Sequence, residues 1–151
     1  MNDPILPAMK DAADALNLEL LQLTAIQPDD FEQAFATAAA RAVGALVLLD
    51  DPVFTAHPQM LAQLAIRQQL PSSGFPDYVP AGGLLAYGVS FPEMWRRVAS
   101  YIDKIVKGTK PADLPIELPT RFRTIVNLRT AKAIGVDVPT SLLLRADEVI
   151  E

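Results

Sequence analysis

The sequence contains no cysteine and only one histidine, His57. The absence of cysteine excludes disulfides, thiolate metal sites and cysteine nucleophiles. A histidine-based zinc site or a Ser-His-Asp arrangement would have to rest on His57 alone. His57 precedes Pro58 at the expected start of a helix, which is typical of a surface or capping residue. The sequence therefore predicts neither an enzyme, a metal centre nor a bound cofactor.

Positive charge is scarce, and long apolar runs are missing. The 151 residues include 13 Lys and Arg against 18 Asp and Glu, for a net charge of -5. Phosphate binding needs clustered Lys and Arg, so no nucleic acid is expected as a partner. No stretch approaches the ~18 apolar residues of a membrane span. The N-terminus lacks the basic start and apolar run of a signal peptide, so a cytoplasmic location is expected if Met1 is the natural start.

Half of the residues are apolar, and their spacing alternates between the helical and the strand period, which is typical of an α/β fold. The pattern predicts strands at 18–26, 45–49, 72–75, 84–87 and 122–127, and helices at 7–16, 29–42, 58–69, 91–108 and 128–135. Asp29 or Asp30 is placed to cap the second helix. This order predicts a three-layer α/β/α arrangement with a mainly parallel sheet and helices on both faces.

The helix at 91–108 carries an apolar stripe. Its members recur at helical spacing: Phe91, Trp95, Val98, Ile102 and Ile105. We expect Trp95 to lie in the core, with the basic residues of the opposite face in solvent. Closely spaced prolines follow this helix. They predict a division into a ligand-binding lobe at 1–114 and a C-terminal return segment at 115–151, which packs on the lobe or on a partner.

Ligands of parallel sheets usually bind beyond the carboxyl ends of the strands. The residues expected there are Asp50, Asp51, Phe54, Gly74, Phe75, Tyr87 and Gly88. The two carboxylates could bind a cation, an ammonium group or a phosphoryl group, or could cap the turn before Pro52. Phe75, Tyr78 and Tyr87 could stack on a flat ligand or pack in the core or rim. The pair Gly82-Gly83 lacks the spacing of a nucleotide loop and favours a tight turn.

Several motifs together resemble the C-terminal half of ABC transporter substrate-binding proteins of the tryptophan/tyrosine-transport type. They are AGGLLAYG, YIDKIVKGTKPADLP, NLRTAKAIG and LLLRADEVIE, in the family's order, with ALVLLDDPVF upstream. The resemblance implies one lobe of a type I periplasmic binding-protein fold with a C-terminal strand-helix extension. It also implies a small amino-acid-like or aromatic ligand, an ABC permease as partner, and a periplasmic or extracellular location.

The same resemblance implies ligand-contacting roles for Asp51, Phe75 and Tyr87, and a weaker one for Asp77. The family's first lobe has no counterpart before Asp3. We therefore expect a homodimer, in which the apolar surface left uncovered by that lobe is buried by a second copy, with exchange of the C-terminal segment as one route. The alternative is a truncated, self-associating α/β module without transport activity.

Overall fold

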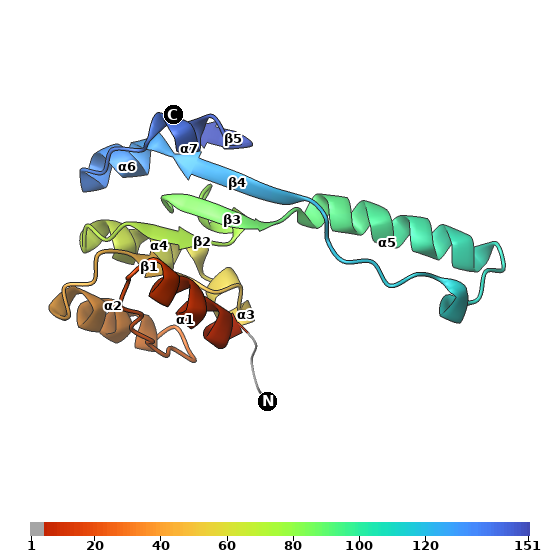
Figure 1. Cartoon of the computed structure of the whole chain (residues 1–151), viewed down its shortest axis with the longest axis horizontal. Coiled ribbons are helices and arrows are strands. Elements are labelled where there is room, and N and C mark those ends of the chain that lie inside the picture. Colours follow the sequence, from red (N-terminus) through yellow and green to blue (C-terminus); the bar gives the residue numbers. More distant parts are fainter. Residues whose placement is uncertain (1–4) are drawn as a thin grey trace. The chain divides into compact units, whose positions relative to one another are not determined.

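The computed structural model describes residues 5–151 (Figure 1). Its contacts divide the chain into two compact units, one ending at Val43 and the other spanning Gly44–Glu151. The described part of the first unit contains helices α1 (Ile5–Ala15) and α2 (Asp30–Ala40), close to their predicted positions. Residues 5–15 and 30–40 therefore confirm two of the helices expected from apolar spacing.

The strand predicted at 18–26 is wrong, because this segment forms neither helix nor strand. Its first backbone N–H, from Leu18, donates back to Ala13 O at 2.8 Å, so the segment starts as the end of a helical turn. The predicted cap of α2 is also wrong. Asp29 makes no side-chain capping bond, and the Asp30 carboxylate instead accepts from the backbone N–H groups of Ile26 and Gln27. These bonds, led by the one from Ile26, lower the pKa of Asp30.

The second unit is built on one five-stranded sheet in the order β1-β2-β3-β4-β5. The strands are β1 (Leu46–Val47), β2 (Ser72–Gly74), β3 (Leu85–Val89), β4 (Phe122–Asn127) and β5 (Glu148–Ile150). β1 with β2, β2 with β3, and β4 with β5 are parallel pairs, whereas β3 and β4 are antiparallel. The predicted α/β class with a mainly parallel sheet is confirmed, and the residues from 122 onward supply two of its strands.

Helices and short turns join these strands. The helices are α3 (Pro52–Thr55), α4 (Pro58–Arg67), α5 (Phe91–Val106), α6 (Leu128–Ile134) and α7 (Thr140–Leu143), with 3-10 turns η1 (Pro76–Tyr78) and η2 (Pro111–Asp113). The Asn127 side chain accepts from Thr130 N at 3.1 Å and caps α6. Gly135 ends that helix with φ 72°, a left-handed conformation that glycine adopts without steric cost.

The core of the second unit lies around α4, η1 and the middle of the sheet. Four residues of α4 are buried: Leu61, Ala62, Leu64 and Ala65. Val79 packs with Ala86 of β3 and Ile125 of β4 in one buried cluster. A second cluster joins Leu84 to Ala131 and Ile134 of α6. Burial of these apolar side chains is what holds the sheet and its helices together.

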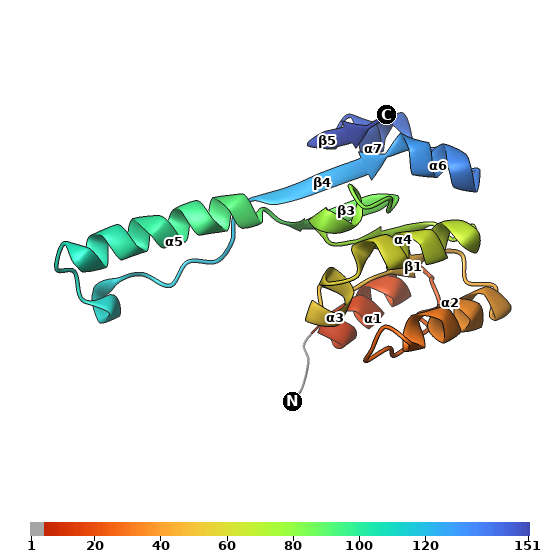
Figure 2. The ribbon, with the colours of Figure 1, turned by 180° about the vertical axis from the view of Figure 1, so that it is seen from behind.

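The long helix α5 buries none of its residues. We use the name arm for residues 90–121, which comprise α5 and the return segment 107–121 between β3 and β4. Figure 2 shows α5 running on from the ends of these two strands instead of lying on their sheet. Trp95 is 67% exposed, so its predicted place in the core is wrong. An amphipathic pattern predicts a helix with an apolar face, but it does not say what covers that face.

Candidate functional site

Three parallel strands bring their carboxyl ends to the same edge of the sheet, and this edge is the candidate site. Val47 pairs with Ser73, and Gly74 pairs with Ala86. Leu48 N, just past β1, donates to Ser73 O at 2.8 Å. The residues that follow β1 and β2 therefore emerge near the last residues of β3, as expected for ligand sites in parallel sheets.

Asp51 follows β1 and caps helix α3. One of its carboxylate oxygens accepts from Val53 N at 2.8 Å, while Pro52 occupies the first helical turn. The capping role left open by the sequence is thus present, and the side chain of Asp51 is exposed. Phe54 lies in α3 and is half-buried. His57 Nδ1 lies 2.9 Å from Val53 O at the start of α4, in the capping region predicted for it.

Gly74 ends β2, Phe75 follows it, and both lie close to Tyr78. The Phe75 ring is only 3% exposed, and it lies tilted at 53° to the Tyr78 ring with 6.0 Å between centroids. A Cβ on Gly74 would approach the Tyr78 ring to 3.0 Å, so this strand end has little room for a side chain. Gly74 and Phe75 are therefore buried beneath the solvent-facing surface of this edge.

Tyr78 is fully buried next to Gly74 and Phe75. Its hydroxyl lies 2.6 Å from Ser72 Oγ, and burial raises its pKa. A Cβ on Gly83 would come within 2.2 Å of the Tyr78 ring, so the absent side chain is what lets the ring enter. Of the two readings open for this residue, core packing is the one found. The signal available in the sequence was the presence of glycines four residues before Tyr78 and four and five residues after it.

Tyr87, the last residue of the predicted strand, and Gly88 both lie within β3, which continues to Val89, so neither lies beyond the end of the strand as expected. The extension arises from pairing with β4, where Tyr87 lies opposite Thr124 and Val89 opposite Phe122. Tyr87 is 64% exposed and stacks on Phe122, with 5.4 Å between centroids and 10° between planes. A Cβ on Gly88 would come within 2.8 Å of Pro76, so β3 and η1 touch at this point.

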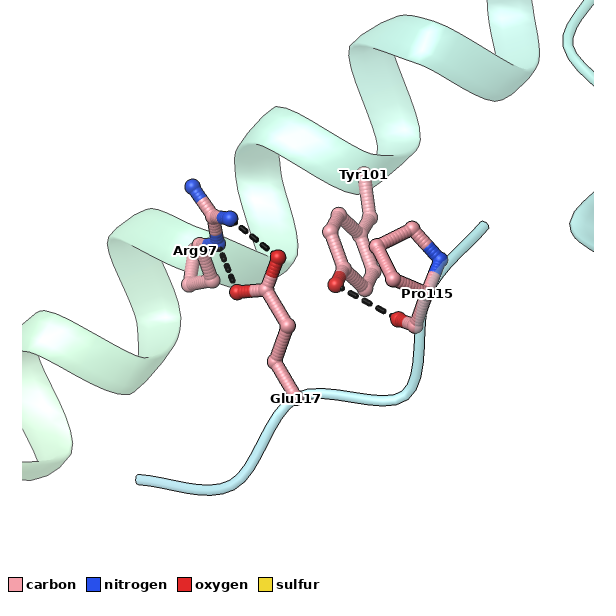
Figure 3. A network of polar contacts seen from close by, with 4 residues as sticks. All are labelled: Arg97, Tyr101, Pro115 and Glu117. Carbon is pink, nitrogen blue, oxygen red and sulfur yellow. Dashed lines mark hydrogen bonds and ion pairs between the residues drawn. The ribbon is translucent and has the colours of Figure 1, made fainter. Parts of the chain in front are cut away.

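The arm is held together by its own polar contacts, as Figure 3 shows. The Arg97 guanidinium binds the Glu117 carboxylate through two nitrogens, with Nε at 2.5 Å from one oxygen. Tyr101 donates its hydroxyl to Pro115 O at 2.8 Å. The hydrogen bonds from Arg97 lower the pKa of Glu117, and Glu117 raises the pKa of Arg97. These contacts fix the extended return segment along one side of α5, and none of them was predicted.

Residues 4–150 match the model of a family described as ABC transporter substrate binding protein. The chain belongs to this family. A comparison with curated proteins found no match. Among residues 5–151, no group of three or more His, Cys, Asp and Glu side chains is placed to hold a metal ion. No helix in this described part has the length and apolar character to cross a membrane.

Three solved structures share the fold of this chain at low sequence identity. A conserved domain protein from Vibrio cholerae is 20% identical, with a TM-score of 0.86, over 96% of this chain and 49% of that one. An ABC domain from Streptococcus pneumonia in complex with L-Trp is 19% identical, with a TM-score of 0.85 and the same coverage. A ligand-free, open substrate binding protein with adhesive properties from Clostridium difficile is 17% identical, with a TM-score of 0.66, over 96% and 48%. This member of the substrate-binding family thus spans about half the length of these chains.

Proposed function

We propose that this chain forms one lobe of a solute-binding protein that serves an ABC-type import system. The family match over residues 4–150 is the observation that carries the proposal. The carboxyl edge of β1, β2 and β3 supports it, because an exposed aromatic ring and an exposed carboxylate lie at the part of a parallel sheet where ligands usually bind. In this role the protein binds and releases its solute without bond chemistry.

The proposed ligand is a small amino-acid-like or aromatic molecule. A structural neighbour holds L-Trp, and Tyr87 offers an exposed flat ring of the kind that stacks on aromatic solutes. We assign Asp51 to an ammonium or other polar group of the solute, because its carboxylate keeps acceptor capacity beyond the bond to Val53 N. The remaining edge residues, Phe54, Gly74, Phe75 and Gly88, would shape the surface below and beside the solute.

The proposed partners are a second lobe and an ABC permease, in a periplasmic or extracellular location typical of the family. The arm is the surface we assign to the second lobe. Its apolar stripe is exposed along the whole of α5, and Ile116 and Leu118 of the return segment are 99% and 81% exposed. An apolar surface of this extent is typical of an interface.

Solute binding can be measured by titration calorimetry with L-tryptophan, L-tyrosine and L-leucine. We expect the aromatic amino acids to bind, and Tyr87→Ala to weaken them by up to about tenfold, as loss of one aromatic contact predicts. Trp95→Ala is the matched control, because Trp95 is 67% exposed against 64% for Tyr87 and lies on the arm. Absence of saturable binding to all three amino acids would contradict the proposal.

The second candidate function is a self-associating module, and the exposed face of α5 is the observation that favours it. Phe91, Trp95, Val98, Ile102 and Ile105 follow one another at alternating steps of four and three residues, the spacing at which two helices pair. A second copy could therefore bury this face in a homodimer. Such pairing would occupy the same surface that we assign to the second lobe.

Light scattering over a range of concentrations measures this self-association. A dimer through α5 should dissociate in Ile102→Asp, which places a charge in the paired face. Ser100→Asp, on the same helix but outside the stripe, should leave the dimer intact. A mass that stays at the 16.4 kDa of one chain at every concentration would rule the homodimer out.

A further inference from the structure

Two exposed aromatic rings meet where the arm leaves the sheet, and only one of them was expected to bind a ligand. Tyr87 of β3 and Phe122 of β4 are 64% and 43% exposed. Their rings are nearly parallel, at 10°, with centroids 5.4 Å apart. Offset stacks of this kind are a favourable arrangement of aromatic rings.

The strand register explains why these two rings meet. Val89 lies opposite Phe122 on the antiparallel neighbour, and residues two apart on a strand point to the same face. Tyr87 and Phe122 are therefore diagonal neighbours on one face of the sheet, within reach of aromatic side chains. Ser90 N donates to Arg121 O at 3.1 Å, and this bond fixes the strand backbone next to Phe122.

The stack leaves the Tyr87 side chain accessible. Phe122 lies offset against one face of the ring, and Tyr87 is 64% exposed, so a solute can approach the ring from the side away from Phe122. An exposed tyrosine without a neighbour would sample several orientations, and ordering it on binding would cost conformational entropy. A ring held flat before the ligand arrives avoids that cost.

We infer that Phe122 is a positioning residue, which holds Tyr87 as a flat platform for a planar, aromatic solute. This inference rests on the proposed solute-binding function and adds a residue and a selectivity to it. The solute would stack on the free face of Tyr87, while Phe122 supports the ring from behind. Selection for flat side chains over branched aliphatic ones follows, because only a flat group matches the platform over its whole area.

The test compares Phe122→Leu, which keeps an apolar side chain but removes the flat ring, with Phe122→Tyr, which keeps the ring. We expect Phe122→Leu to weaken L-tryptophan by about three- to tenfold, with L-leucine changed by less than about twofold. Phe122→Tyr should bind both as the wild type does. The NMR signals of the Tyr87 ring give a second readout, because removal of the stacked ring in Phe122→Leu should shift them downfield without any ligand.

The possible results distinguish failure of the positioning role of Phe122 from failure of the proposed solute-binding function. If the wild-type chain binds L-tryptophan and Phe122→Leu binds it equally well, the positioning role is overturned and the solute-binding proposal stands. Unchanged Tyr87 ring signals in Phe122→Leu would likewise overturn the positioning role. If the wild-type chain binds none of the amino acids tested, the proposed function fails and the platform fails with it.

Discussion

Helices α4 and α5 are both amphipathic, but only α4 buries its apolar face within the second unit. The ten residues of α4 include four that are buried, whereas the sixteen residues of α5 include none. The difference lies in what the chain does next, because α4 is followed by a strand that joins the sheet beside β1. α5 is followed by the return segment, whose side-chain and backbone oxygens accept hydrogen bonds from α5 itself. An apolar stripe on a helix therefore indicates a surface that a partner covers, and that partner need not be the nearest sheet.

Truncation of a buried leucine and of an exposed isoleucine tests this contrast with the largest expected effects. Leu61 of α4 is 1% exposed and Ile102 of α5 is 56% exposed. Leu61→Ala should lower the free energy of unfolding by about 2–5 kcal/mol through lost burial and the cavity left behind. Ile102→Ala should change it by no more than about 0.5 kcal/mol. Urea unfolding of both variants measures the difference, and equal losses would mean that α5 is covered in solution.

Substitution of Gly83, which lies against the Tyr78 ring, tests how tightly the core beside the sheet is packed. An alanine Cβ at Gly83 would lie 2.2 Å from the ring of a residue with no exposed surface, so one of them must move. We expect Gly83→Ala to destabilise the protein by about 1–3 kcal/mol, the usual range for overpacking. Gly44→Ala is the matched control, because no atom lies within 4 Å of its added Cβ. Similar unfolding midpoints for the two variants would contradict the packing described.

Much of this architecture was accessible from residue patterns. The apolar spacing of 30–40 and 58–67 located two helices, and the short apolar run at 45–49 located the strand β1. The weaker strand candidate at 72–75 also proved to be a strand. Gly82-Gly83 was correctly read as a tight turn, in which Gly82 N donates to Val79 O and Gly83 N to Tyr78 O. These features depend on local periodicity and turn chemistry, which the sequence expresses directly.

Other features depend on contacts between distant residues, and local patterns could not supply them. Residues 18–26 have strand-like composition, but a strand also needs a neighbour to pair with, and none is provided. The strand was expected to end at Tyr87, because the pairing of β3 with β4, far along the chain, could not be foreseen. The same applies to the stacking of Tyr87 on Phe122. At the candidate site, the sequence indicated which residues follow the carboxyl ends of the strands, but not that Phe75 and Tyr78 are buried there.

Removal of one hydroxyl gives a smaller effect that still separates buried from exposed positions. Tyr78→Phe leaves Ser72 Oγ without the partner that now lies 2.6 Å away in the core. A loss of about 1 kcal/mol in the free energy of unfolding is expected for one buried hydrogen bond. Tyr87→Phe removes the same group from a residue that is 64% exposed and should leave stability unchanged. Urea unfolding of the pair checks this, and a Tyr78→Phe variant as stable as the wild type would argue against the Ser72 bond.

The smallest effect concerns the ion pair that holds the arm in shape. Arg97 lowers the pKa of Glu117 from its ordinary value of 4.5. A carboxyl with a lower pKa in the folded state adds stability above its unfolded pKa and loses it as the pH falls through the folded value. The arm should therefore be ordered near neutral pH and loosen in acid below about pH 4.5. Because both side chains are substantially exposed, solvent screening keeps the effect small and local.

NMR order parameters of the backbone amides of Ile116 and Glu117, measured from about pH 7 to about pH 3, resolve this local change. They should fall as the pH falls in the wild type. In Glu117→Gln they should be low throughout, because the charged pair is absent at every pH. Glu148→Gln removes a carboxylate that pairs with Arg123 on the sheet and should leave the arm's pH response intact. Order parameters that are independent of pH in the wild type would show that the hydrogen bond from Tyr101 to Pro115 O holds the return segment without the ion pair.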